Sequence, residues 1–391
     1  MKPALLGWAA GAVLVACGQS ASSVPITATV SPSPRASPTA SASPSTSATP
    51  AASVEVLSIT ATYAGVTIHV LTFSGGSTTD RIVLAHQKLN VLDANRRVAL
   101  ITTSNSTELA TLDLNTAAVR GLGVTSPGGM GPGVLSPDGT EAAVAVRAAD
   151  LTNYEILVVD LNSGVARTLL QVPASSYNRA GIDPIRWTDT GILVSPARWD
   201  GPRVALLNLD SQSAKLTPLT DAQFDALSPD ARMISAAGHA NLGDVQFDGQ
   251  GGWPNRLSVG PLGAPAAVIA QQVNRAFKVL DVTNDGSVIY TSDDAPFATR
   301  APAPDMGLYL ETSSHSIHQL GETRISQWQA ARFVGDGLAL VANQTVGGSS
   351  GTIEIDLVSL CPSGDGCSVT TKTLETDSGM YPTAALFVLS R

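Results

Sequence analysis

The stretch LSPDGTEAAVAV, residues 135–146, decides how this sequence folds. Its first half is a turn: Pro137 presets φ at the first central position, the Asp138 side chain caps the turn, and Gly139 accepts a φ above zero. Its second half is a run of small and aliphatic residues, as expected of a strand that is buried between neighbours. The stretch therefore predicts a tight turn followed by a buried β-strand.

This unit recurs along the chain. Close copies are LSPDARMISAA (227–237) and VTNDGSVIYT (282–291); looser ones are WTDTGILVS (187–195), FVGDGLALVA (333–342) and LDANRRVALIT (92–102). The turn residues that mark the six copies lie 43, 51, 41, 55 and 51 residues apart. Such a spacing accommodates four antiparallel strands with three turns, which is one blade of a β-propeller. The markers are Asn95, Asp138, Asp189, Asp230, Asp285 and Asp336.

A second signature, an exposed strand ending in a polar turn, follows each marker by about twenty residues. It is seen in LVVDLNSGVARTL (157–169), ALLNLDSQSAKLTPL (205–219) and LATLDLNTAAVRGL (109–122). We expect it to form the outer two strands of a blade, joined by a tight hairpin.

Together the two signatures resemble the WD-like repeats of TolB-type β-propellers, over nearly all of residues 80 to 390. Two copies depart from the pattern: Ala231 stands where Gly is expected, and the copy with Asp189 lacks the Pro. The resemblance implies the fold; it implies no single activity, because propellers serve as binding modules, scaffolds and enzymes.

Six markers account for six blades over roughly residues 80 to 375. Two strands from Val54 to Phe73 and one innermost-type strand from Tyr381 to Ser390 remain. We expect the last strand to join the first two in a closing blade, because this covers edges that would otherwise pair with other chains. The prediction for residues 54–391 is thus an all-β propeller of seven blades, with six as the alternative. Two β-sandwiches would leave the sixfold recurrence unexplained.

The N-terminus predicts export and a lipid anchor. Residues 1–16 contain Lys2 and an apolar stretch from Ala4 to Ala16, which suits a secretory signal and is too short to span a bilayer. Residues 14–17, Leu-Val-Ala-Cys, resemble the lipobox of bacterial lipoproteins, and this resemblance implies a lipidated Cys17 as the first mature residue. An ordinary signal peptide with an incidental Cys and an uncleaved anchor are the alternatives.

Residues 17–53 are predicted to be a disordered tether. Between Ser31 and Pro50, nineteen of twenty residues are Ser, Pro, Thr or Ala, and such a segment has too little large apolar surface to offset the entropy of ordering. The propeller would then be extracytoplasmic and lipid-anchored to a bacterial membrane, at the cell surface or in the periplasm.

The candidate chemistry is sparse. A formal charge of -9 without a Lys/Arg cluster excludes a nucleic-acid binder. Cys361 and Cys367 flank a polar turn and, outside the cytoplasm, are expected to form a disulfide; no second Cys or His pair supports a metal or redox pair. His315 and His318 are expected to be a surface pair. We expect no serine nucleophile of the G-x-S-x-G kind, because the sequence offers no strand-turn-helix context for one. The sequence therefore predicts no catalytic residue, no cofactor and no metal site.

Three irregular stretches are the candidate binding loops: 198–202, 239–255 and 293–305. Their aromatic residues are Trp199, Phe247, Trp253 and Phe297. Loops at the faces of a propeller commonly bind partners. We therefore predict a monomeric propeller that binds or scaffolds a protein or polymer of the cell envelope. The alternatives are an enzyme of lactonase, lyase or quinoprotein type, for which a metal bound by His86 or His239 would be evidence, and a small-ligand sensor that uses the central funnel.

Overall fold

The computed structural model divides the chain into two units, Met1–Pro50 and Ala51–Arg391. The predictions for the signal peptide, Cys17 and most of the tether lie outside the described residues. Within the described ranges, no helix is long and apolar enough to cross a membrane. The structure describes residues 53–74, 77–103, 106–148, 152–173, 181–196, 203, 205–222, 224–238, 256–271, 275–294, 307–322, 326–335, 338–347, 350–359, 370–380 and 383–389.

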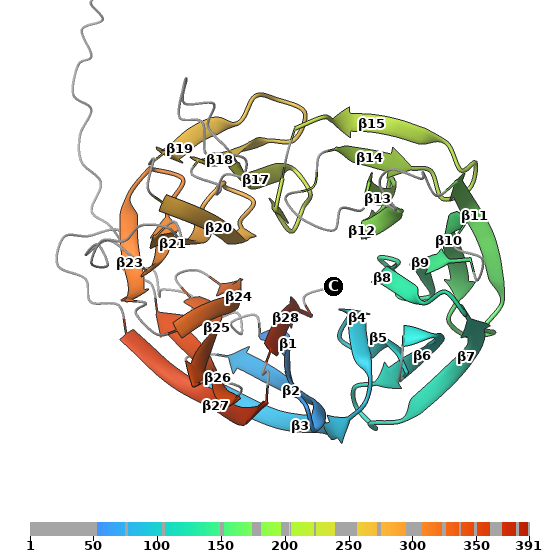
Figure 1. Cartoon of the computed structure of the whole chain (residues 1–391), viewed down its shortest axis with the longest axis horizontal. Helices are drawn as coiled ribbons and strands as arrows, with labels where there is room; N and C mark the ends of the chain where they lie inside the picture. Colours follow the sequence, from blue (N-terminus) through green and yellow to red (C-terminus); the bar gives the residue numbers. More distant parts are fainter. Residues whose placement is uncertain are drawn as a thin grey trace, which may run out of the picture. The chain divides into compact units, whose positions relative to one another are not determined.

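The second unit is a ring of seven four-stranded antiparallel blades, as predicted (Figure 1). Blade 1 consists of β4 (Asn90–Ala94), β5 (Val98–Thr102), β6 (Glu108–Asp113) and β7 (Val119–Thr125). Blade 2 consists of β8 (Met130–Leu135), β9 (Glu141–Arg147), β10 (Asn153–Asp160) and β11 (Ala166–Pro173). Blade 3 consists of β12 (Ile182–Thr188), β13 (Gly191–Pro196), β14 (Leu206–Leu209) and β15 (Leu216–Thr220).

The remaining blades repeat this order from the innermost to the outermost strand. Blade 4 consists of β16 (Ala226–Leu227), β17 (Met233–Gly238), β18 (Arg256–Pro261) and β19 (Ala267–Gln271). Blade 5 consists of β20 (Arg275–Val282), β21 (Val288–Asp294), β22 (Gly307–Glu311) and β23 (Ile317–Glu322). Blade 6 consists of β24 (Ser326–Gly335), β25 (Leu338–Gly347), β26 (Ser350–Ser359) and β27 (Thr370–Met380).

The closing blade combines both ends of the ring. Its order is β28 (Thr383–Val388), β1 (Val54–Thr62), β2 (Gly65–Ser74) and β3 (Ser77–Gln87). The innermost strand β28 pairs with β1, so the predicted closure is confirmed. One boundary was wrong, because β3 belongs to this blade and not to the first marked one. The segment was missed since Val83 is the one residue of β3 that is buried, which leaves little pattern to recognise.

The strands after the markers are buried between blades, as their aliphatic composition predicted. In β5 and β9, Leu100 and Val144 are fully or almost fully buried and belong to the same apolar cluster. A comparable cluster fills each of the other seams. The ring is therefore held by apolar packing from blade to blade.

The two faces of the ring carry different connections. We call the face with the turns between first and second strands the marker face. Adjacent turns meet there: the Asp230 N–H donates to Asn284 Oδ1 of the next blade at 3.0 Å. Because consecutive strands are antiparallel, the hairpins between third and fourth strands share this face. Connections between second and third strands, and between blades, lie on the opposite face, which we call the loop face.

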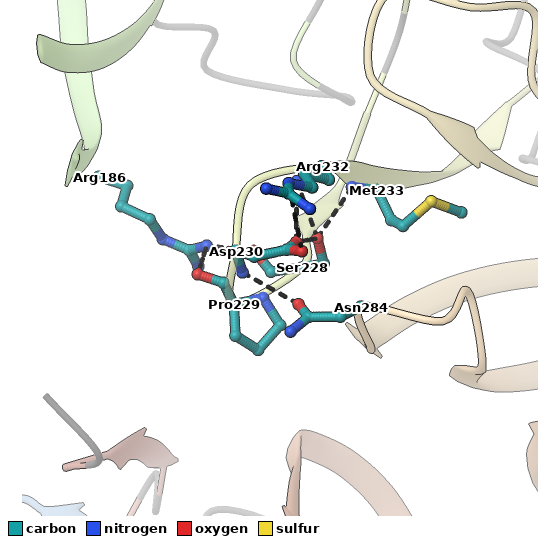
Figure 2. A network of polar contacts seen from close by, with 7 residues as sticks. All are labelled: Arg186, Ser228, Pro229, Asp230, Arg232, Met233 and Asn284. Carbon is teal, nitrogen blue, oxygen red and sulfur yellow. Dashed lines mark hydrogen bonds and ion pairs between the residues drawn. The ribbon is translucent and has the colours of Figure 1, made fainter. Parts of the chain in front are cut away.

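The marker turns have the predicted chemistry. In blade 2 the Ser136 hydroxyl donates to Asp138 Oδ1 at 2.6 Å, and Gly139 has a φ of 70°. In blade 4, Figure 2 shows the same arrangement, with the Ser228 hydroxyl 2.8 Å from Asp230 Oδ1. Ala231 replaces Gly and nevertheless adopts a φ of 60°. The turn geometry thus persists where the sequence departs from the pattern.

Arginine side chains tie neighbouring blades together on the marker face. Arg186 of β12 donates to the carbonyls of Ser228 and Pro229 in the next blade, the latter at 2.9 Å (Figure 2). At the outer rim, arginines of β3, β7 and β11 each donate to a carbonyl beside the outer hairpin of the next blade. The pairs are Arg81 with Leu114, Arg120 with Asn162, and Arg167 with Ser211.

Candidate functional site

All residues predicted to bind partners or to form the disulfide lie outside the described residues. They are Trp199, Phe247, Trp253, Phe297, Cys361 and Cys367, and these assignments stay predictions. The strands that flank the three predicted binding loops are described. They are β13–β14, β17–β18 and β21–β22, which are the second and third strands of blades 3, 4 and 5. The flanking strand ends therefore lie on one face, the loop face, in three consecutive blades.

A group of charged residues lies beside these strand ends, which we call the mouth cluster: Asp183, Arg203 and Asp225. Asp183 is near the start of β12, and Asp225 immediately precedes β16, so both lie at the loop-face ends of innermost strands. Arg203 is held by paired backbone hydrogen bonds with Phe224, at 3.1 and 2.9 Å. The Asp225 carboxylate accepts the N–H of Ala237 at 2.6 Å. No local sequence pattern identifies this cluster.

Partial desolvation perturbs the pKa values of all three residues of the mouth cluster, of which Asp225 is the most exposed. Desolvation raises the pKa values of Asp183 and Asp225, and attraction to Arg203 opposes both shifts. Desolvation also lowers the pKa of Arg203, against the attraction of the two carboxylates. Charged groups with perturbed pKa values beside a ligand-accessible face are typical of binding sites. The mouth cluster thus offers both a cation and anions for contacts with a polar partner.

A second group of polar residues lies in the seam where the ring closes, and we call it the seam cluster: His69, Asp80 and Glu375. His69 is on β2, Asp80 is on β3, and Glu375 is on β27 of blade 6, which packs against β1 (Figure 1). His69 Nδ1 is 2.9 Å from Asp80 Oδ1 and 3.7 Å from Glu375 Oε1. Among the described residues, this is the one group of three His, Cys, Asp or Glu side chains close enough to share a metal ion.

The seam cluster runs from solvent into the protein. The side chain of Asp80 is 39% exposed, that of His69 14%, and that of Glu375 5%. The Ser58 hydroxyl donates to Glu375 Oε2 at 3.1 Å. No described residue donates a hydrogen bond to the other oxygen, Oε1, which is buried. Burial raises the pKa of Glu375 to about 7, opposed by His69 and by the Ser58 hydrogen bond.

The polar character of this seam follows from the pairing of β1 and β2. Val56 pairs with Leu71 and both belong to an apolar cluster, whereas the next pair on the same face is Ser58 with His69. The following residue on this face of β1, Thr60, donates to Asp377 Oδ2 at 2.9 Å. The seam therefore changes from aliphatic to polar as it approaches the loop face.

The other histidines stand apart from the seam cluster. His315 lies in the turn after β22, where its Nδ1 is 3.1 Å from Glu311 Oε1, and His318 lies on β23. His315 is exposed and His318 is half-buried. His86 is exposed on β3, and His239 lies outside the described residues.

No family model and no curated protein matches this sequence. Among solved structures, the chain is similar to an oligogalacturonate lyase from Vibrio parahaemolyticus at 12% identity, with a TM-score of 0.52, covering 73% of this chain and 87% of that one. It is also similar to the propeller domain of the Trilobed protease from Pyrococcus furiosus at 13% identity, with a TM-score of 0.50, covering 82% and 94%. TolB from Acinetobacter baumannii matches at 13% identity, with a TM-score of 0.42, covering 85% and 66%.

At these identities the first two structures establish the fold and nothing finer. The protease domain has an open velcro topology, whereas in this chain β28 pairs with β1 and closes the ring. Residues Ala51–Arg391 are therefore a closed, seven-bladed β-propeller.

Proposed function

We propose that this chain is a lipid-anchored, TolB-type propeller that binds a protein or polymer of the bacterial cell envelope through the loop face of blades 3 to 5. One observation carries the proposal: the strand ends that flank the three predicted binding loops lie on one face of three consecutive blades. A continuous sector of this kind suits a macromolecular partner, because such partners need a broad contact area.

The charges beside this sector support a polar partner. Asp183, Arg203 and Asp225 lie at the loop-face ends of blades 3 and 4, within the same sector as the predicted aromatic residues. Aromatic anchors next to an arginine are the residue types that dominate binding energy in protein interfaces. The sequence of residues 1–53 supplies the anchor and the tether in this proposal.

The binding proposal is tested by crosslinking in intact cells and capture of the tagged, full-length chain. We expect an envelope component that is retained by the wild type and lost in the Trp199→Ala/Trp253→Ala double variant. The matched control is Tyr63→Ala, because Tyr63 is 82% exposed in the turn between β1 and β2, on the loop face but in the closing blade. Equal capture of the envelope component by the wild type and the double variant would refute binding through the loop face of blades 3 to 5.

The anchor is tested separately with Cys17→Ala. We expect this variant to leave the membrane fraction, since a lipidated cysteine carries the acyl chains that hold the protein there. Mass spectrometry of the mature N-terminal peptide gives the second readout. An unmodified Cys17 in a membrane-bound protein would refute the lipid anchor. It would not affect the proposed binding sector of blades 3 to 5, which the capture experiment tests separately.

A further inference from the structure

We propose that His69, Asp80 and Glu375 bind one divalent transition cation of the zinc type in the seam that closes the ring. This goes beyond the proposed binding function and departs from the sequence analysis, which predicted no metal site. The donor set is one imidazole nitrogen and two carboxylates. Imidazole favours zinc and related transition metals, and carboxylates complete many three-ligand zinc sites.

The spacing of the donor atoms fits such an ion. Two ligands bound at about 2.0–2.1 Å in tetrahedral geometry lie about 3.4 Å from each other. His69 Nδ1 and Glu375 Oε1 are 3.7 Å apart, His69 Nδ1 and Asp80 Oδ1 are 2.9 Å apart, and all three donor atoms lie within 4.8 Å of one another. Small side-chain rotations therefore bring all three to one centre.

The second observation is that the buried Oε1 of Glu375 accepts no hydrogen bond from the described residues, although it lies 3.7 Å from His69 Nδ1. The Glu375 side chain is 95% buried. A buried carboxylate oxygen without a donor is costly, and a bound cation would remove that cost. The Ser58 hydroxyl holds the other oxygen, which is the kind of outer contact that orients a metal ligand.

An ion at this position would connect two blades of the ring. His69 and Asp80 belong to the closing blade, and Glu375 belongs to the last strand of blade 6. The ion would join elements that are 306 residues apart (375 minus 69), across the seam where the two ends of the ring meet. Because Asp80 is partly exposed, the ion can reach the site from solvent and can keep a water ligand.

The test is zinc binding by the full chain, stripped with a chelator and equilibrated with Zn²⁺ at pH 7.5. We expect one Zn²⁺ per chain that is absent from Asp80→Asn and Glu375→Gln, with an affinity loss of at least about tenfold in each. Zn²⁺ should raise Tm by about 3 °C in the wild type and not in these variants. Ca²⁺, which prefers six to eight oxygen ligands, should not substitute at equal concentration.

The matched control is Asp377→Asn, two residues along β27, whose carboxylate accepts from Thr60 and lies outside the donor group. This variant should bind Zn²⁺ like the wild type. Asp80→Asn changes a partly exposed residue, so its fold is expected to survive even if Glu375→Gln is destabilised. A folded wild type that takes up no Zn²⁺, or equal uptake by the wild type and Asp80→Asn, would overturn the proposal and leave the cluster as a polar contact between blade 6 and the closing blade.

Discussion

The marker face and the loop face of the ring are built from the same strands but connected in different ways. On the marker face, the turns between first and second strands take two to five residues, from 189–190 to 136–140. On the loop face of blades 3 to 5, the corresponding connections are residues 197–205, 239–255 and 295–306. The turns between first and second strands are therefore short and locally determined, whereas the connections between second and third strands of blades 3 to 5 are long.

The side chains follow the same division. Arginines bond blade to blade on the marker face, and aspartates cap its turns. The mouth cluster lies at the loop-face ends of its strands, and the closing seam becomes polar toward that face. The bonds that join neighbouring blades thus lie on the marker face, and the proposed binding sector lies on the opposite face, where its loops can differ without disturbing those bonds.

Arg186→Met tests the marker face most strongly. The guanidinium of Arg186 donates to carbonyls of blade 4, including that of Pro229 at 2.9 Å, and hydrogen bonds from a charged donor contribute about 1.5–3 kcal/mol. We expect urea unfolding to give a stability loss of about 2–3 kcal/mol. Arg232→Met is the control, because its side chain is 84% exposed with one ion pair at 3.8 Å and should change stability by less than about 0.5 kcal/mol. Equal losses would show that the inter-blade bonds are unimportant.

Gly164→Ala tests the hairpins of the marker face. Gly164 has a φ of 75°, and a Cβ there would lie 2.5 Å from the Leu122 carbonyl oxygen of the neighbouring blade. We expect a loss of about 2 kcal/mol, from the left-handed backbone and the clash together. Gly123→Ala separates the two causes, because Gly123 has a φ of 70° with nothing near its Cβ position, and should lose only about 1 kcal/mol. Thermal unfolding of both variants decides whether close packing of blades adds to backbone strain.

The fold was predictable because its signals are local. A turn such as 136–140 is specified by residues within five positions of each other, so a single sequence contains all the chemistry that forms it. The aliphatic composition of the strand that follows then indicates that this strand is buried. The inter-blade arginines also have a sequence pattern that was not recognised. Arg120 follows the hairpin aspartate Asp113 by seven residues, and Arg167 follows Asp160 by the same number.

The seam cluster was not predictable from the same sequence. Its three residues lie on three different strands. His69 and Glu375 come close only because β28 closes the ring and places blade 6 beside β1. Register at two interfaces decides which side chains face each other, and no local pattern encodes that. The mouth cluster has the same character, because Asp183 and Asp225 come from different blades.

Ala231→Gly is expected to strengthen the marker face. Ala231 adopts a φ of 60°, where glycine is found in the equivalent turns at Gly139 and Gly286. The left-handed conformation costs a residue with a Cβ about 1–2 kcal/mol, and part of the gain is offset because glycine loses more entropy on folding. We expect a gain of about 0.5–1 kcal/mol in chemical unfolding. Loss of stability would mean that the Ala231 methyl group packs more favourably than its backbone is strained.

The smallest expected effect is the response of a marker turn to acid. Hydrogen bonds from the Ser136 hydroxyl and from the Thr140 N–H lower the pKa of Asp138 below its usual value of 3.8. A carboxylate whose pKa is lower in the folded state stabilises the protein above its unfolded pKa, and this contribution is lost as the pH falls through the folded value. Because the side chain is exposed, the effect should stay below about 1 kcal/mol.

Asp138→Asn removes this titration while keeping an oxygen that can cap the turn. We expect the difference between Tm at pH 6 and Tm at pH 3 to be smaller in the variant than in the wild type, with the change arising mainly from the wild type's loss at low pH. If Tm decreases by the same amount in both proteins on acidification, the turn is held by its backbone geometry. The aspartate then contributes to the marker face through its shape and not through its charge.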